Sequence, residues 1–289
     1  MLIRFPGEGK NVETQTLYCL TETDLNHLKK WFSHYVRSFY CADPVTQQAI
    51  ELKEKHSLSV CSEILNVGRQ LRMSQNSLRI AEAMALFHDI GRFDQFTRYR
   101  TFADRKSENH AKLGVEVLRR ENTLAALNEE TRNLILKAIS FHNRLSIPDG
   151  ETHICMHFSR LLRDADKLDI FNLVSSYYCA DPGERSNAIE LDLPDTPGMS
   201  DEILTSLLNG KMISMQQIQS CNDFKLFQMG WIYDINFQPA FQIIQERDYL
   251  KKIREALPQS DRIDHIYNHL LSYLKQRSAS SSPPQMIPV

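Results

Sequence analysis

The spacing of apolar residues predicts a chain that is almost entirely helical. Over residues 44–73 apolar side chains recur at helical intervals, and Asp43 followed by proline is a typical helix start. Residues 77–90 repeat this pattern, and Gly91 is expected to end that helix. The same spacing predicts further helices over residues 21–40, 109–120, 129–142, 154–174, 200–208, 214–235 and 239–275, the last with a break near Pro258. The predicted fold class is therefore all-α.

Four segments lack this periodicity. Residues 1–20 have an irregular pattern, and residues 92–107, rich in arginine, lysine and aromatics, are predicted to form a loop. Residues 181–198 carry three prolines and two glycines, which is typical of a surface excursion. The serine- and proline-rich residues 276–289 are expected to be a disordered tail. Since none of these segments marks a domain boundary, residues 21–275 are predicted to form a single helical domain.

The composition and net charge of the chain argue against nucleic acid and membrane as binding partners. With 42% hydrophobic residues the 289-residue chain has ample material for a core, and a formal net charge of -2 gives no overall attraction to nucleic acid or to anionic membrane. The N-terminus lacks the apolar run of a signal peptide and no apolar stretch is long enough to cross a bilayer, so a soluble cytoplasmic protein is expected. The cysteines have no C-x-x-C spacing and are predicted to be reduced and mostly buried.

A few histidines and aspartates fall where the apolar pattern expects core. His56 lies within a helical apolar stretch, His88 and Asp89 end another, and Asp166 follows Leu161-Leu162. Because a buried carboxylate beside buried imidazoles is costly unless a cation neutralises it, these residues predict a metal site. Imidazole with carboxylate suits one or two divalent ions of iron, manganese, zinc, nickel or cobalt rather than calcium.

Two further histidines could extend this site. His110 begins a predicted helix, and His142 ends the apolar run of another. If Asp89 bridges, His110 and His142 could hold a second ion about 3.5–4 Å from the first. The pairs His153/His157 and His265/His269 also have the i, i+4 spacing of zinc chelates, but they lack the H-E-x-x-H glutamate and a third ligand, and are expected to be exposed.

The order His56, His88-Asp89, Asp166 resembles the H…HD…D signature of the HD-domain phosphohydrolase superfamily over roughly residues 50–175. Residues 87–91 are similar to its central motif, and residues 164–169 to its closing motif, also found in the dNTP triphosphohydrolase branch. Residues 110–118 resemble the second-metal motif of binuclear members. The resemblance therefore implies a metal-ligand set of His56, His88, Asp89, His110, His142 and Asp166.

Two details refine that resemblance. The segment 141–144 has one histidine and no Gly-Tyr-Pro follows, which separates the chain from the HD-GYP phosphodiesterases of cyclic di-GMP. Among the three acids of residues 164–169, helix geometry alone does not choose the ligand, although Asp169 lies nearest the middle of the apolar stripe. The resemblance assigns Asp166, and leaves Asp164 and Asp169 to support the ligands.

The resemblance implies a phosphohydrolase that cleaves a phosphate ester, phosphodiester or anhydride of a small, nucleotide-like substrate by a metal-activated hydroxide. Asp89 is expected to orient this hydroxide, and Arg92 and Lys167, with Arg144, to bind phosphate. The aromatic and arginine side chains of residues 93–102 could stack on a nucleobase, although packing on the domain is favoured.

The alternatives are a regulatory nucleotide-binding module without turnover and a metal-dependent nuclease, which the neutral charge balance disfavours. The helices after residue 200 are assigned to packing over the site or to self-association, so a homo-oligomer is possible.

Overall fold

The computed structural model describes residues 17–179, 190 and 193–280 of the chain. These residues form helices and no strand, which confirms the predicted all-α class. The α-helices are α1 (Glu22–Arg37), α2 (Pro44–Gln70), α3 (Gln75–Phe87), α4 (Gly91–Tyr99), α5 (His110–Arg120), α6 (Glu129–Phe141), α7 (His153–Cys179), α9 (Asp201–Leu208), α10 (Cys221–Gly230), α11 (Gln238–Glu246), α12 (Tyr249–Glu255) and α13 (Asp261–Ala279). Short 3-10 helices are η1 (Asp104–Lys106), η3 (Met215–Gln217) and η4 (Trp231–Asp234). No described helix is long and apolar enough to cross a membrane.

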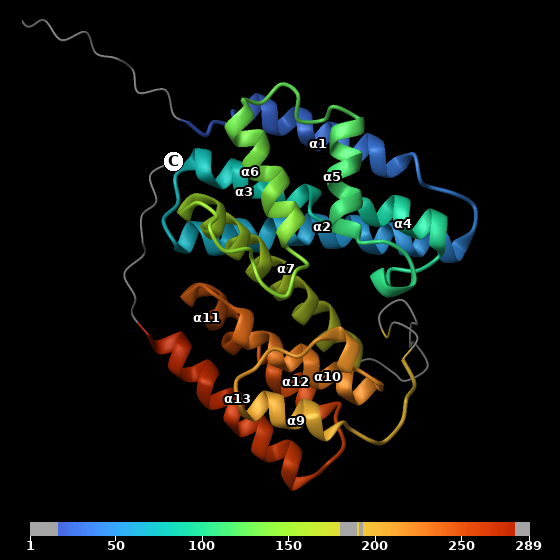
Figure 1. The fold of residues 1–289 in the computed structure, drawn as a ribbon, viewed down its shortest axis with the longest axis vertical. Coiled ribbons are helices and arrows are strands. Elements are labelled where there is room, and N and C mark those ends of the chain that lie inside the picture. Colours follow the sequence, from blue (N-terminus) through green and yellow to red (C-terminus); the bar gives the residue numbers. More distant parts are fainter. Residues whose placement is uncertain (1–16, 180–189, 191–192, 281–289) are drawn as a thin grey trace, which may run out of the picture.

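The helices form two groups joined by α7 (Figure 1). Helices α1 to α6 gather at one end of the molecule, and α9 to α13 at the other. The long α7 runs from the first group into the second, and packs against α2, α3 and α6 as well as α11 and α12. A side chain on α7 can therefore contact both groups.

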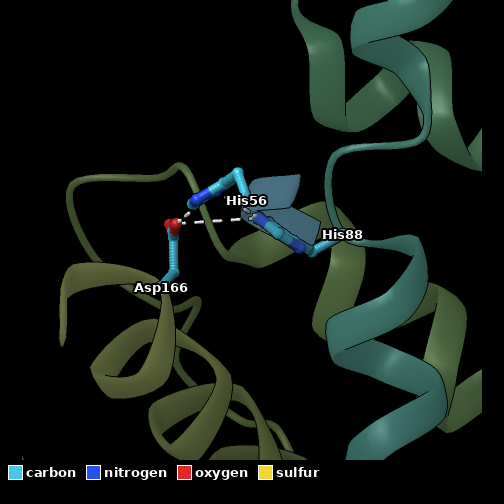
Figure 2. Close-up of side chains that lie close together, drawn as sticks. All are labelled: His56, His88 and Asp166. Carbon is cyan, nitrogen blue, oxygen red and sulfur yellow. Dashed lines mark hydrogen bonds and ion pairs between the residues drawn. The ribbon is translucent and has the colours of Figure 1, made fainter. Parts of the chain in front are cut away.

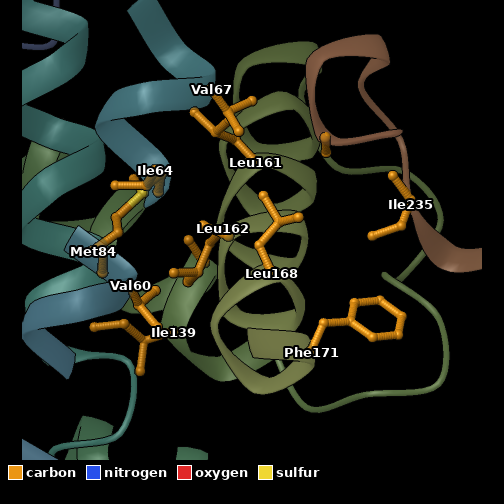
Figure 3. Packing of buried hydrophobic residues seen from close by; sticks show 14 of the residues in the cluster. Val60, Ile64, Val67, Met84, Ile139, Leu161, Leu162, Leu168, Phe171 and Ile235 are labelled. Carbon is orange, nitrogen blue, oxygen red and sulfur yellow. The ribbon is translucent and has the colours of Figure 1, made fainter. Parts of the chain in front are cut away.

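One continuous apolar core holds α7 in this position. Val60, Ile64 and Val67 of α2 face Leu161 and Leu162 of α7, and all five are buried (Figure 3). Burying one such side chain fully is worth about 1.5–3 kcal/mol, so this contact is a major source of stability for the site below.

Side-chain caps fix where the first helices begin. Thr21 and Asp24 form a capping box at α1. Asp43 accepts from the backbone of Thr46 at the start of α2, where Pro44 occupies the first turn. Because these caps satisfy backbone donors that lack helical partners, the helix starts are set locally by the sequence.

The loop predicted for residues 92–107 is wrong over its first half. Residues Gly91–Tyr99 form α4, so Gly91 begins a helix instead of ending one. A Cβ atom at Gly91 would lie 2.3 Å from the backbone oxygen of His110 and 2.6 Å from the backbone nitrogen of Gly114. This glycine is therefore needed for the close approach of α4 to α5. The phenylalanines of this segment are buried, as the packing alternative expected; Phe93 is fully buried and Phe102 nearly so.

Other boundaries also differ from prediction. The helix predicted over 214–235 is divided into η3, α10 and η4, and that over 239–275 is broken at Asp248, whose φ is 54°, as well as near Pro258. Helix α13 continues to Ala279, so residues 276–279 do not belong to a disordered tail. Most of residues 1–20 and 181–198, and the end of the tail, lie outside the described residues. The single-domain boundaries remain a prediction.

No disulfide joins the described cysteines, and only half of them are buried. Cys61, Cys155 and Cys221 are buried, whereas three lie exposed: Cys19, Cys41 and Cys179. The expectation that most are buried is therefore wrong.

Candidate metal centre

Two of the candidate histidines occupy the same local position at the end of a helix. His88 follows α3 and His142 follows α6, each as the C-cap residue. Nδ1 of His88 lies 2.8 Å from the carbonyl oxygen of Ala85, and Nδ1 of His142 lies 2.7 Å from that of Ile139. The last carbonyls of a helix lack backbone partners, so each ring satisfies one of them while its other nitrogen points away from the helix.

The other two histidines are held by carboxylates. Nδ1 of His56, in the middle of α2, lies 2.6 Å from Oδ2 of Asp169. Nδ1 of His110, the first residue of α5, lies 2.8 Å from Oδ2 of Asp104. Ionised carboxylates and carbonyls only accept hydrogen bonds, so Nδ1 carries a proton in all four rings, and Nε2 carries the lone pair whenever the ring is neutral.

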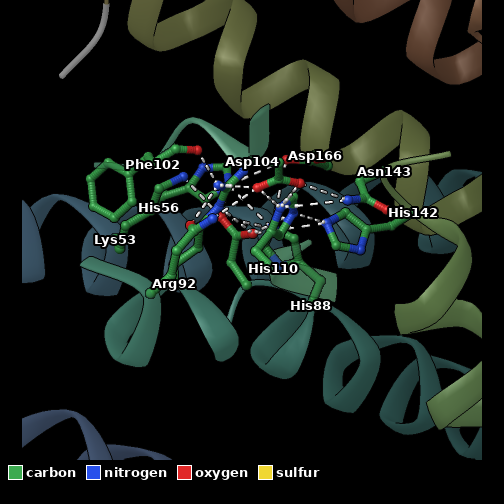
Figure 4. Close-up of polar contacts among 12 residues, drawn as sticks. Lys53, His56, His88, Arg92, Phe102, Asp104, His110, His142, Asn143 and Asp166 are labelled. Atoms are coloured by element: carbon green, nitrogen blue, oxygen red, sulfur yellow. Dashed lines mark hydrogen bonds and ion pairs between the residues drawn. The ribbon is translucent and has the colours of Figure 1, made fainter. Parts of the chain in front are cut away.

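The four Nε2 atoms converge in pairs (Figures 2 and 4). Nε2 of His56 lies 3.1 Å from Nε2 of His88, and Nε2 of His110 lies 3.0 Å from Nε2 of His142. In neutral rings with the proton on Nδ1, lone pair would face lone pair in both contacts. Such an arrangement is unfavourable unless a cation lies among the nitrogens, and neutral imidazoles backed by acceptors are the usual ligands of a transition metal.

Two carboxylates complete the cluster. Oδ1 of Asp166 lies 3.2 Å from Nε2 of His56 and 3.6 Å from that of His88. Asp89 divides its oxygens: Oδ2 lies 3.6 Å from Nε2 of His56, whereas Oδ1 lies 3.3 Å from Nε2 of His110. The other two histidines are divided in the same way: Nε2 of His88 lies 3.8 Å from Oδ2 of Asp89, and Nε2 of His142 lies 3.8 Å from Oδ1. Asp89 therefore lies between two sets of nitrogen ligands.

The charges of the cluster favour a cation. Burial and Lys53 lower the pKa of His56, but Asp166 and Asp169 outweigh them and raise it to about 9. Burial opposes ionisation of Asp89, yet Lys53, His88 and Arg92 hold its pKa well below the usual range. At His142, burial together with His110 and His88 lowers the pKa to about 3. A proton is thus disfavoured at His142, which keeps its lone pair available to a metal.

The donor set fits a divalent transition metal. His56, His88 and Asp166 form one group whose ligand atoms lie within 4.8 Å of one another, and His88, Asp89 and His142 form another. Imidazole nitrogens with carboxylate oxygens are ligands for iron, manganese, zinc, nickel or cobalt, while calcium prefers oxygen alone.

Comparison with known proteins agrees with this geometry. Residues 54–170 match the HD domain family. Over these residues the chain is similar to HD domains. This family consists of metal-dependent hydrolases, and the resemblance inferred from the sequence is confirmed at that level. No curated protein and no solved structure matches the chain. All six predicted ligands lie within residues 54–170, and the structure brings them together in one cluster, in which Asp166 is partly buried and the other five are buried.

The acids that accompany Asp166 in the HD domain have different positions. Asp169 supports the cluster through His56 and also accepts from the hydroxyl of Ser59. Asp164 instead accepts from the backbone of Asn236 and Phe237. Burial raises the pKa of Asp164 to about 7. Asp164 thus joins α7 to the C-terminal helices and does not support a metal ligand, contrary to expectation.

The two histidine pairs with i, i+4 spacing, His153/His157 and His265/His269, belong to no cluster of potential metal ligands in the described part of the chain. His153, His265 and His269 are exposed, as expected. His157 is partly buried, with its ring centroid 5.0 Å from that of Phe237, so the expectation fails there.

The predicted phosphate-binding cations are only partly available. Nη1 of Arg92 donates to the side chain of Asp104 at 3.0 Å and to the carbonyl of Phe102, and its Nε lies 3.4 Å from Oδ1 of Asp89, so this guanidinium is already engaged by the protein. Nζ of Lys167 lies 2.6 Å from Oδ2 of Asp234. Arg144 is exposed and lies over the ring of Phe141, 5.1 Å from its centroid.

Several residues of the site were not found from the sequence. Lys53 donates to Oδ2 of Asp89 at 2.8 Å, and Asp104 accepts from His110 and, at 3.2 Å, from Asn143. Asp104 falls in the segment without periodicity, where nothing in the pattern connects it with His110. Lys53 does lie three residues before His56 on the same helix, which is a signal that could have indicated it.

The cluster forms part of a cavity of about 460 Å³ that extends beyond the HD domain. His56, Asp89 and Asp166 line one part, and the exposed Arg105 and Arg144 lie at this same cavity. Residues of η3, α10 and η4, all outside residues 54–170, line the rest. Of the two roles expected for the C-terminal helices, the cavity therefore favours packing over the site.

Proposed function

We propose that this protein is a binuclear metal-dependent phosphohydrolase that cleaves a phosphate ester, phosphodiester or anhydride of a small, nucleotide-like substrate. The observation that carries the proposal is the division of Asp89, whose Oδ2 faces His56 and His88 while Oδ1 faces His110 and His142. A carboxylate in this position can bridge two ions, with Asp166 completing the first ligand set.

The residues suit attack on phosphorus by water. Divalent ions held here would activate a water molecule at neutral pH and neutralise charge on the phosphate oxygens. Asp89 would orient the attacking water. Nζ of Lys53 lies 2.8 Å from Oδ2 of Asp89 and keeps this carboxylate ionised. No serine or cysteine nucleophile is needed for such a reaction.

Phosphate recognition is assigned to cations on the cavity wall. The ammonium of Lys167 donates to Asp234 and to the backbone carbonyl of Arg163, which leaves its third donor for a substrate, and Lys167 lines the cavity beside Asp166. Arg105 and Arg144 line the same cavity, are exposed, and form no ion pair with any carboxylate of the described chain. Arg92 is assigned the supporting task of holding Asp104, and through it His110.

The test combines metal analysis with an activity screen. The purified protein and the variant Asp89→Asn are analysed for bound metal and assayed for phosphate release and diester cleavage with manganese, iron and zinc. About two ions per chain with hydrolysis is expected for the native protein, and the variant should lose both.

The exposed His265→Gln variant is the matched control and should retain metal and activity. Hydrolysis that persists in Asp89→Asn would contradict the proposal. Metal and nucleotide binding without any turnover would favour a regulatory module instead.

A further inference from the structure

The part of the cavity farthest along α7 is an apolar chamber built by the C-terminal helices. Its walls include Met212, Ile213, Met215, Phe224, Phe227 and Trp231. The ring of Trp231 makes edge contacts with Phe227, at a centroid distance of 5.3 Å, and with Phe171, at 5.8 Å. The indole is therefore held in a fixed orientation by aromatic neighbours, and the chamber has a rigid aromatic wall.

One buried amide interrupts this apolar lining. Gln228 of α10 lines the cavity and its relative exposure is 0%. Its Oε1 accepts from the hydroxyl of Tyr178 at 2.9 Å, whereas Nε2 has no hydrogen-bond partner among the described residues. Exchanging the two amide atoms would leave Oε1 without a partner instead, so one end of the amide is free in either orientation.

A free buried amide on a cavity wall needs an explanation, because buried polar groups are normally hydrogen-bonded. In a binding site, the ligand provides the missing partner. An alkyl chain would fill the chamber but would leave the amide unpaired. A sugar or a charged group would bring several polar atoms against Met212, Ile213 and Phe227, where the lining offers them no partners.

We propose that the chamber binds a flat, uncharged heterocyclic ring carried by the leaving group of the substrate, and that the free end of the Gln228 amide recognises a hydrogen-bonding atom on the ring's edge. This inference rests on the proposed function for the placement of the phosphate at the histidine and aspartate cluster. Trp231 and Phe227 provide apolar surface for the ring. Tyr178 is a positioning residue, since it fixes the amide and contacts the ligand only through it.

Ring binding can be measured without any hydrolysis. The chain has two tryptophans, so the variant Trp31→Phe leaves Trp231 as the single fluorescent indole. The full-length protein is titrated with the common purine and pyrimidine nucleosides and with the phenyl riboside, which has the same sugar but no hydrogen-bonding atom on its ring. We expect at least one nucleoside to quench Trp231 at a concentration about tenfold or more below that needed for the phenyl riboside.

The variant Gln228→Leu should abolish that difference, while Gln216→Leu, at an exposed glutamine of η3, should preserve it. If Gln228→Leu fails to fold, Gln228→Glu carries the test. It retains an acceptor for Tyr178 and removes the amide donor, so it should change which nucleoside is preferred. Equal binding of all rings by the native protein, or a preference that neither Gln228 variant alters, would overturn the inference.

The outcomes separate this inference from the proposed function. If nucleosides bind with the expected dependence on Gln228 but no phosphate ester is hydrolysed, the ring site stands and the hydrolase proposal falls. Hydrolysis of nucleoside and phenyl riboside phosphates at equal kcat/KM, with no effect of Gln228→Leu, would leave the hydrolase and remove the ring site.

Discussion

Oδ2 of Asp169 lies 2.6 Å from Nδ1 of His56, one turn along α7 from Asp166, which meets the other nitrogen of the same ring. A single helix thus holds His56 from both sides. The contact fixes the tautomer that presents Nε2 to the cluster, and Ser59 donates to the second oxygen of Asp169. Support of this kind raises the basicity of a metal-ligating histidine and fixes its orientation.

Replacing Asp169 with Asn should therefore weaken the half of the site formed by His56, His88 and Asp166. The amide accepts more weakly than a carboxylate, and a loss of about 10- to 100-fold in affinity for one ion is expected. Calorimetric titration of metal-depleted protein with manganese or zinc measures it. Asp149→Asn, at an exposed loop aspartate, should bind metal as the native protein does. If Asp169→Asn lowered the affinity for both ions equally, Asp169 would not act only on the half of the site formed by His56, His88 and Asp166.

Asp104 has the corresponding role for His110. Its carboxylate accepts from Nδ1 of His110 at 2.8 Å, and despite its burial this contact, with Arg92, holds the pKa of Asp104 well below the usual range. Asp104→Asn should weaken the binding step that depends on His110 and His142 by about 10- to 100-fold and leave the other step unchanged. The same titration tests this. If the two aspartate variants weaken the same step, the chain holds one ion and the binuclear proposal is wrong.

The cluster of candidate ligands could be predicted from the sequence because its residues lie within or at the ends of apolar helical patterns, and the resemblance to HD-domain proteins then selected Asp166 from three neighbouring acids. The residues that support the candidate ligands were harder to predict from the sequence. Asp104 lies in a segment without periodicity, and Gln228 occurs in a helix after residue 200 that carries no recognised motif. Their roles depend on contacts between distant parts of the chain, such as that of Tyr178 with Gln228, which local patterns do not encode.

Gly91 shows how a correct local rule gave a wrong boundary. Glycine often ends helices, so the sequence predicted a loop after it. The residue is glycine here because α4 passes within contact distance of the α5 backbone, a tertiary requirement that the helix pattern cannot reveal. The fold class was nevertheless predictable, because the helical spacing in α2 and α7 is long and regular.

The close approach of Gly91 to the backbone of α5 leads to a prediction about the stability of the fold. In Gly91→Ala the new Cβ would lie 2.3 Å from the carbonyl oxygen of His110, and backbone atoms cannot move aside as a flexible side chain can. Thermal unfolding should show a loss of about 3 kcal/mol or more, together with weaker metal binding, because His110 is displaced. Gly198→Ala is the matched control, since a Cβ there meets nothing within 4 Å. Equal melting temperatures for the two variants would contradict the packing argument.

Lys167 is expected to bind substrate phosphate and not metal. Its ammonium contacts Asp234, which also pairs with Arg163, so Lys167→Met leaves Asp234 with a cationic partner. KM should rise about tenfold with bound metal unchanged, because one charged contact to phosphate is worth roughly 1.4 kcal/mol or more. Steady-state kinetics and metal analysis of the same samples measure both quantities. Lys211→Met, at an exposed lysine, serves as control. A loss of metal in Lys167→Met would mean that the lysine maintains the cluster instead.

The partly buried His157 should make stability depend on pH. Burial and the neighbouring Arg160 lower its pKa from 6.5 to about 4 in the folded protein. Between these values the unfolded chain binds a proton at this residue and the folded chain does not. The contribution of the neutral ring to the free energy of unfolding is therefore complete above about pH 6.5. It declines as the pH falls toward 4, by about 1–2 kcal/mol after allowance for solvent screening.

His157→Leu, which keeps an apolar contact with Phe237, should remove this part of the decline in the free energy of unfolding, measured in urea from pH 7.5 to 4.5. His153→Leu, one turn earlier on α7 at an exposed histidine, should retain it. Identical pH profiles for the native protein and His157→Leu would show that the residue is protonated as readily in the fold as in the unfolded chain.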